Sequence, residues 1–296
     1  MLASDSIQPD VRTVLEVGNV SFVVERYGTN QRPVCVLCSA INQTMASWQR
    51  YLARLLKNVN VVLWSYGLPL NPSNEGDYQS LVENLHLTVE TLVAPGQKVY
   101  LLGICFGGGI AFEYAQAHSH RVRGLILSGA VVTNDIPFIE HHNALWQLYL
   151  AGHKRPVMDI FFNSLFGERM LRALVAAPDH RKKIKKKCDL TFTDAFPLLL
   201  RYLTFHLRGK SDDNALRKLN DVHVILLIGR DDQIAMPHSQ KNVLRYFDDA
   251  RCKCVEYEGV GHLAYLEVEQ EFFTEVTAFI DACERSTEIS RAQTGV

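Results

Sequence analysis

A cysteine bracketed by glycines stands where an apolar run changes into a helical one. Cys105 is the centre of Gly-Ile-Cys-Phe-Gly at 103–107, between the strand-like run 98–104 and the helix-like run 108–117. Such a sharp strand-to-helix turn holds a nucleophile in a strained backbone conformation, and the flanking glycines let strand and helix approach closely. The pattern predicts that Cys105 is a nucleophile, and the alternative is a buried core cysteine.

A cysteine nucleophile needs a histidine as base and an acid that orients it, and both follow later in the chain. The apolar strand 224–229 leads into Asp231 and Asp232. Asp232, three residues after Gly229, is the preferred acid and Asp231 the alternative, although an ordinary solvated turn would also explain the pair. His262 follows the strand 253–257 on a loop with glycines on both sides. The predicted triad is therefore Cys105, Asp232 and His262.

The other ten histidines lack this setting at a strand end. His206 and the adjacent His141 and His142 fall in a helical region and are expected to be lid or surface residues. An oxyanion hole also requires two backbone N–H donors. We expect one from Phe106 and the other from Ala40 or Ile41.

Alternating strand-like and helix-like segments position these residues. Strands at 12–17 and 20–27 around a turn at residues 18–19 predict an opening hairpin. The later rhythm of strand and helix implies a mostly parallel sheet covered by helices on both faces. Further strands are expected at 34–39, 59–65, 98–105, 122–130, 223–229 and 253–257, and helices at 47–58, 78–93, 108–117, 238–247 and 270–283.

The rhythm stops between residues 132 and 219, where the spacing is helical throughout. An all-helical insertion in such a sheet predicts a lid over the strand ends, where substrates bind. We therefore expect a core of residues 1–133 and 218–285, a lid of residues 134–217 and a flexible tail of residues 286–296.

Composition excludes several classes of protein. The formal net charge of −1 argues against general nucleic-acid binding. No N-terminal signal pattern and no apolar stretch of about 20 residues is present, which predicts a soluble, cytoplasmic protein without a membrane span. The seven cysteines suit a reducing compartment. Cys35 and Cys38 should face opposite sides of a strand, and Cys252 and Cys254 lack partners, so no metal or cofactor is expected.

The order of elbow, Gly-x-x-Asp loop and Gly-x-Gly-His loop resembles that of the α/β-hydrolase superfamily over residues 12–133 and 218–283. The cysteine elbow is similar to that of polyhydroxyalkanoate synthases and dienelactone hydrolases. The loop 39–41, the segment 259–267 and the central lid resemble 3-hydroxyacyl carrier-protein acyltransferases of rhamnolipid and polyhydroxyalkanoate precursor synthesis, which carry serine at the elbow. The resemblance implies an α/β-hydrolase fold, with a mostly parallel central sheet flanked by helices and an all-helical lid insertion.

Cysteine also favours a particular class of acyl donor. A thiolate that attacks an oxoester is itself the better leaving group, whereas exchange with a thioester is close to thermoneutral. We therefore expect an acyltransferase that takes its acyl group from acyl-coenzyme A or an acyl carrier protein and passes it to a small-molecule hydroxyl, amine or thiol. The alternatives are a thioesterase or a lactone or ester hydrolase, and a non-catalytic receptor on the same scaffold.

Two features of the insertion are open to two interpretations. The six basic residues within 181–187 could steer an acidic carrier protein or the phosphates of coenzyme A, or could form a solvated helix end. The apolar stretches 160–162, 165–166 and 196–200 could line an acyl tunnel, or could pack the insertion itself.

Overall fold

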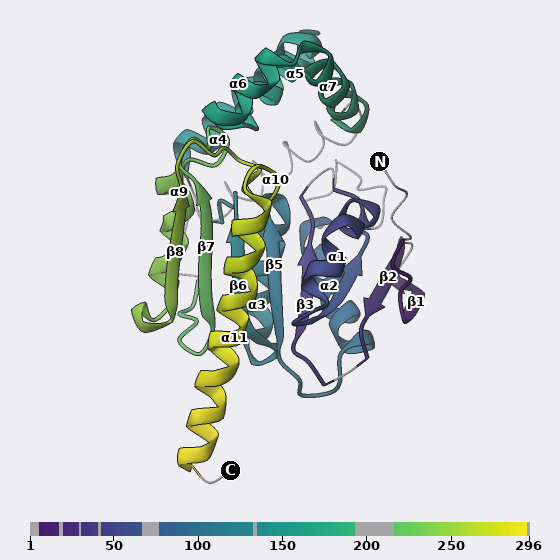
Figure 1. Ribbon diagram of the computed structural model, residues 1–296, viewed down its shortest axis with the longest axis vertical. Coiled ribbons are helices and arrows are strands. Elements are labelled where there is room, and N and C mark those ends of the chain that lie inside the picture. The colour runs from purple at the N-terminus through teal and green to yellow at the C-terminus, as the bar shows by residue number, and fades with distance from the viewer. Residues whose placement is uncertain are drawn as a thin grey trace.

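Eight strands form one sheet in the order β1-β2-β4-β3-β5-β6-β7-β8, and helices cover both of its faces (Figure 1). Strand β2 pairs antiparallel with β1 and β4, and every other pairing is parallel. The mostly parallel sheet expected from the sequence is confirmed. The computed structural model describes residues 6–17, 20–29, 31–40, 43–66, 77–132, 135–192 and 216–294.

The strands are β1 (Val11–Val17), β2 (Val20–Tyr27), β3 (Val34–Cys38), β4 (Asn60–Trp64), β5 (Val99–Ile104), β6 (Val122–Ser128), β7 (His223–Gly229) and β8 (Cys252–Tyr257). The helices are η1 (Met45–Trp48), α1 (Gln49–Leu55), α2 (Asp77–Leu92), α3 (Phe106–His118), η2 (Ser119–Arg121), α4 (Ile136–Leu150), α5 (Lys154–Ser164), α6 (Glu168–Ala176), α7 (Pro178–Phe192), α9 (Pro237–Lys241), η4 (Asn242–Tyr246), η5 (Asp249–Arg251), α10 (Ala264–Glu267) and α11 (Glu269–Thr294).

The central strands are buried on both faces, which explains their continuous apolar sequences. Every residue of β3, β4 and β5 is buried. Helices α2 and α3 pack on one face, whereas α1 and α11 pack on the other. Phe272 and Phe273 of α11 are completely buried, and each contributes about 2 kcal/mol to the docking of that helix. The sheet is thus a rigid base for residues at its edge.

The structure departs from the predicted elements in four places. The helix expected at 47–58 begins as the 3-10 helix η1, and the helix expected at 238–247 divides into α9 and η4. Helix α11 continues to Thr294, beyond the predicted end at residue 283. The short helix α10 follows the His262 loop and was not predicted. The expected turn at residues 18–19 lies outside the described residues.

The insertion between β6 and β7 begins with the four helices α4 to α7, which lie beyond one end of the sheet (Figure 1). This is the end at which β5 and β7 finish. Residues 193–215 of the expected lid, including the apolar stretch 196–200, lie outside the described part. Of the helices that are described, none combines the length and the hydrophobicity needed to cross a membrane.

Candidate active site

Cys105 occupies a strained turn between β5 and α3. Its φ is 51° and its ψ is −119°, and among the described residues it is the sole non-glycine with a positive φ. The N–H of Cys105 donates to the carbonyl oxygen of Ser128 on the neighbouring strand at 2.8 Å, which holds the turn against the sheet. A strained residue that its surroundings fix in this way is typical of functional positions.

The two glycines of the elbow permit close contacts between backbones. A Cβ on Gly107 would lie 2.1 Å from the carbonyl oxygen of Cys38, and one on Gly103 would lie 2.5 Å from the Cα of Gly108. Any side chain at either position would push the helix away from the strand. The glycine spacing seen in the sequence therefore has a steric cause.

Asp232 and His262 form a buried pair beside the elbow. Nδ1 of His262 donates to the carboxylate of Asp232, at 3.1 Å from Oδ1 and 3.0 Å from Oδ2. Further donors fix that carboxylate: the N–H groups of Ile234 and Ala235 and the side-chain amide of Gln240, each at 2.9 Å. Among these donors, His262 is the one side chain that can exchange protons near neutral pH. The fixed carboxylate of Asp232 is therefore well placed to orient the His262 ring.

The alternative acid, Asp231, points elsewhere. Its Oδ2 accepts the N–H of Glu168 at 3.0 Å, which ties the loop after β7 to the first turn of α6. Of the two predicted acids, Asp232 is the one that contacts the histidine.

The environment of His262 favours its protonated form. Burial acts to lower the pKa of the imidazole, but the negative charges of Asp232 and Cys105 outweigh it and hold the pKa well above its ordinary value. Nε2 of His262 is buried without a hydrogen-bond partner among the described residues. The effect of Cys105 on this pKa places the thiol close to the imidazole. A catalytic hydrogen bond that is loose without substrate often tightens when substrate is bound.

This raised pKa predicts how the stability of the protein depends on pH. The protonated imidazole is stabilised in the folded state, so its contribution is complete below the unfolded pKa of about 6.5 and is lost as pH rises through the folded pKa. We expect the difference in free energy of unfolding between wild type and His262→Gln to shrink from pH 6.5 upwards. Urea denaturation at several pH values measures it, and a difference that grew with pH would contradict the assignment.

Gly129 and Gln240 support the histidine from behind. The side-chain carbonyl of Gln240 accepts the N–H of Gly129 at 2.9 Å, while its amide nitrogen donates to Asp232. Gly129 has a φ of 64°, and a Cβ there would lie 2.7 Å from Cε1 of His262. Gln240 and Gly129 thus position the acid and the ring respectively, and nothing in the sequence pattern identified either.

Gly129→Ala is expected to lower kcat by roughly 100-fold, because the new methyl group displaces the His262 ring. Gly96→Ala is a matched control, since Gly96 has a φ of 77° but open space around its Cβ position. Both substitutions strain the backbone by about 1 kcal/mol or more, so thermal unfolding should report at least that loss for each, and a larger one for Gly129→Ala because of its contact with the ring. A similar kcat for the two variants would show that Gly129 does not position the ring.

The predicted oxyanion donors have different surroundings. Phe106 is the first residue of α3, where backbone N–H groups have no acceptor within the helix. The N–H of Ala40 instead donates to Oε1 of Gln43 at 3.1 Å, so this side chain must move before the amide can serve an oxyanion. Nε2 of Gln43 is buried without a partner among the described residues. Ile41, the alternative donor, lies outside the described residues.

Glu267 clamps the insertion to the histidine loop. Its carboxylate accepts the N–H of Gly261 at 2.9 Å and the N–H of Gly167, between α5 and α6, at 3.1 and 3.2 Å. Arg169 of α6 donates to the carbonyl oxygen of Glu267 at 3.0 Å. Burial raises the pKa of this carboxyl. The N–H of Gly261, next to His262, and the N–H of Gly167, in the insertion, therefore share the carboxylate of Glu267 as their acceptor.

The other histidines singled out in the sequence are not equivalent. His142 of α4 is 2 % exposed, and burial lowers its pKa to about 4. Its Nδ1 lies 2.8 Å from the carbonyl oxygen of Phe138. The charge of His262 also acts on it, so His142 lies inside the insertion near the site and the surface alternative is wrong for this residue. His206 lies outside the described residues.

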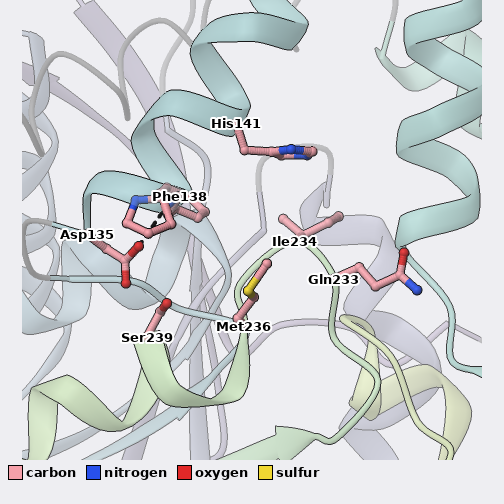
Figure 2. A pocket seen from close by; sticks show the side chains of 8 residues that line it. Asp135, Phe138, His141, Gln233, Ile234, Met236 and Ser239 are labelled. Atoms are coloured by element: carbon pink, nitrogen blue, oxygen red, sulfur yellow. Dashed lines mark hydrogen bonds between the residues drawn. The ribbon is translucent and has the colours of Figure 1, made fainter.

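A hollow lies between α4 and the loop after β7, next to the residues that follow Asp232 in the chain (Figure 2). Phe138 and His141 line it from α4, and Ile234 and Met236 line it from the loop that begins at Asp232. Its volume of about 10 Å³ accommodates a water molecule at most. This hollow as it stands therefore cannot hold an acyl chain.

The remaining sequence features divide between surface and core. Of the basic residues on α7, Lys185 pairs with Asp159, and Arg181 donates to Asn163 at 2.9 Å, so both hold α7 against α5. Aromatic residues of the stretches 160–162 and 165–166 are buried in one cluster within the insertion. Cys35 and Cys38 lie in the clusters on opposite faces of the sheet. No group of three potential metal ligands occurs among the described residues.

The sheet order, the cysteine elbow and the buried Asp–His pair at the strand ends define an enzyme of the α/β-hydrolase fold. More particularly, the chain belongs to the family described as serine aminopeptidase, S33, which it matches over residues 32–269. Cys105 stands at the elbow of this chain although the family is named for serine. No curated protein matches the sequence.

Solved structures agree on the fold. An α/β-hydrolase enzyme from a Medee basin deep-sea metagenome library is 15 % identical, with a TM-score of 0.75 over 91 % of this chain and 97 % of that one. An esterase from Exiguobacterium antarcticum is 18 % identical, with a TM-score of 0.72 over 92 % of this chain and all of that one. The enol-lactonase from Burkholderia xenovorans LB400 is 15 % identical, with a TM-score of 0.69 over 91 % and 100 %.

Proposed function

We propose that the protein is a cysteine-dependent hydrolase of acyl thioesters. The observation that carries this proposal is the placement of Cys105, at a strained elbow, beside a histidine that a buried carboxylate orients. A cysteine in this position forms an acyl-enzyme, and a thioester is the acyl donor whose leaving group matches it. The hydrolase family and the esterase and lactonase folds support water as the acceptor.

The reaction proceeds in two stages around one histidine. His262 is the imidazolium at the start of the reaction, with the proton of the Cys105 thiol held on its Nε2, and the thiolate attacks the thioester carbonyl carbon. The tetrahedral intermediate collapses with cleavage of the bond to the departing sulfur, to which His262 returns the proton. His262 then removes a proton from water, whose oxygen attacks the carbonyl carbon of the acyl-cysteine. The bond from that carbon to Sγ breaks, the acid leaves, and His262 returns the proton to the sulfur of Cys105. Asp232 stabilises the imidazolium in both stages.

Charge develops on the carbonyl oxygen twice in this sequence. The N–H of Phe106 at the start of α3 is one donor for it, and the positive end of the helix dipole lies in the same place. The second donor comes from the loop after β3, where Gln43 occupies the amide of Ala40. We infer that bound substrate displaces the Gln43 carbonyl from that amide.

Transfer to a small-molecule acceptor, as expected from the sequence, is the second candidate. The observation that favours it is the burial of His262, which is 3 % exposed beneath an insertion clamped to its loop. Restricted access of water would lengthen the life of the acyl-cysteine and let a hydroxyl, amine or thiol compete. Acyl-coenzyme A or an acyl carrier protein would be the donor in either case.

Intact-mass spectrometry separates these functions. Wild type and Cys105→Ala are mixed with acyl-coenzyme A and acyl-carrier-protein thioesters of several chain lengths, with and without acceptors. We expect an acyl adduct on wild type alone that decays to free acid in water. An adduct that persists until an acceptor is added would establish transfer. A failure of every thioester to give either adduct or turnover would refute the proposal.

A further inference from the structure

A second cavity lies at the opposite end of the sheet from Cys105. Its volume is about 260 Å³, and Lys98, Arg123, His223 and Arg251 line it. These four residues come from the amino ends of the adjacent strands β5, β6, β7 and β8. Strand β5 is six residues long, so this amino-end cavity is about 20 Å from the elbow. Helix α11, which extends beyond the sheet (Figure 1), completes the wall with Ser286 and Thr287.

The basic side chains of the amino-end cavity are poorly neutralised. Lys98 and Arg123 make no ion pair or hydrogen bond with any described residue, and the bond of Arg251 is to Nε2 of His223 at 2.9 Å. Asp221 is the one carboxylate among the lining residues, and it lies beyond ion-pair distance of Lys98. On α11 the nearby Glu284 accepts the hydroxyl of Tyr100 at 2.6 Å.

The electrostatics of the cavity reflect this crowding of positive charge. Burial and then the charge of Arg123 lower the pKa of Lys98, against the opposing effect of Asp221. Burial and then the charges of Arg251 and Arg123 lower the pKa of His223. Like charges held together in a partly buried cavity repel one another, and an anion placed between them would relieve that repulsion.

We propose that the amino-end cavity is a binding site for a phosphate-bearing anion. The two guanidinium groups can bind phosphate oxygens through paired N–H donors, and Lys98 adds a compact charge. Ser286 and Thr287 lie on the same wall, and the hydroxyl of Thr287 donates to the carbonyl oxygen of Cys283 at 3.0 Å, so the charged groups would supply the contacts to the anion. The ligand would not touch the acyl substrate. This site is therefore independent of the proposed hydrolase activity.

Isothermal titration with inorganic diphosphate tests the site directly. Wild type, Lys98→Gln and Arg123→Gln are compared at constant ionic strength, with Arg155→Gln as a control that removes the same charge from an exposed position on α5. We expect saturable binding that weakens about tenfold or more in the two cavity variants and is unchanged in the control. Circular dichroism confirms that each variant is folded.

Two further measurements identify the class of anion that binds and show that it binds beside His223. Tighter binding of adenosine 3′,5′-bisphosphate than of diphosphate would identify a nucleotide ligand, whereas the reverse order would identify a free phosphate anion. Diphosphate should also raise the pKa of His223 in a nuclear magnetic resonance titration, since the anion offsets the neighbouring arginines. Absence of saturable binding to wild type, or equal affinities for Arg123→Gln, Lys98→Gln and Arg155→Gln, would overturn the proposal.

Discussion

Replacing Cys105 by alanine is expected to lower kcat for thioester cleavage by at least about 10⁴-fold, the scale on which loss of a covalent nucleophile acts. The residual rate would come from binding and from the N–H of Phe106, which the substitution leaves in place. Steady-state kinetics with an acyl-coenzyme A substrate measures the loss. Because alanine at a φ of 51° remains as strained as cysteine, the melting temperature should change little.

Cys105→Ser is the matched variant for the choice of substrate. With serine as the nucleophile, the attacking and departing groups of an oxoester are both oxygens. The tetrahedral intermediate then no longer expels the nucleophile in preference to the leaving group. We expect the ratio of kcat/KM for thioester over oxoester to fall by at least tenfold relative to wild type, with binding of the acyl group unchanged. An unchanged ratio would mean that the sulfur of Cys105 does not determine the donor class.

Neutralising the orienting acid should have the second large effect. Asp232→Asn is expected to reduce kcat by about 10⁴-fold, the cost seen when the acid of a Ser-His-Asp triad becomes an amide. An asparagine that donates to Nδ1 of His262 would fix the wrong tautomer and place a proton on Nε2, which then cannot act as base. The substitution also removes the main charge that raises the pKa of His262, so that pKa should fall in a nuclear magnetic resonance titration.

Asp231→Asn provides the control, because the two aspartates are adjacent and differ in their partners. Asp231 accepts the N–H of Glu168, and an amide oxygen can accept the same bond. We expect Asp231→Asn to retain kcat within about threefold, since a surface substitution of this kind rarely alters more. Equal losses in the two variants would contradict the assignment of Asp232 as the partner of His262.

Most strands of the sheet, and the order of the candidate residues along the chain, could be predicted from the sequence. Parallel strands buried on both faces are continuous apolar runs, so β3 to β7 were found within two residues of their ends. Residues at the carboxyl ends of such strands meet at one edge, which is why Cys105, Asp232 and His262 could be grouped. The choice between Asp231 and Asp232 rested on spacing, and the hydrogen bond to His262 now distinguishes them.

Contacts between segments that are far apart in the sequence could not be predicted from local sequence patterns. The bond between Gln43 and Ala40 depends on the path of a loop with no regular spacing. The burial of His142 depends on how α4 packs against the core, which helical periodicity does not specify. The basic residues of the amino-end cavity are spread through the sequence between Lys98 and Arg251. They become neighbours in space because strands β5, β6, β7 and β8 lie side by side in the sheet.

The Glu267 clamp bears on how this enzyme can be re-engineered. Exchange of helical insertions between relatives is an obvious route to new substrates, and the boundaries are usually drawn in the loops that flank the insertion. Here the insertion is also attached between those boundaries, because Gly167 and Gly261 share the carboxylate of Glu267. A chimera that imports α5 and α6 without a matching residue at position 267 would leave buried N–H groups unpaired beside His262. The segment 259–267 should therefore be exchanged together with the insertion.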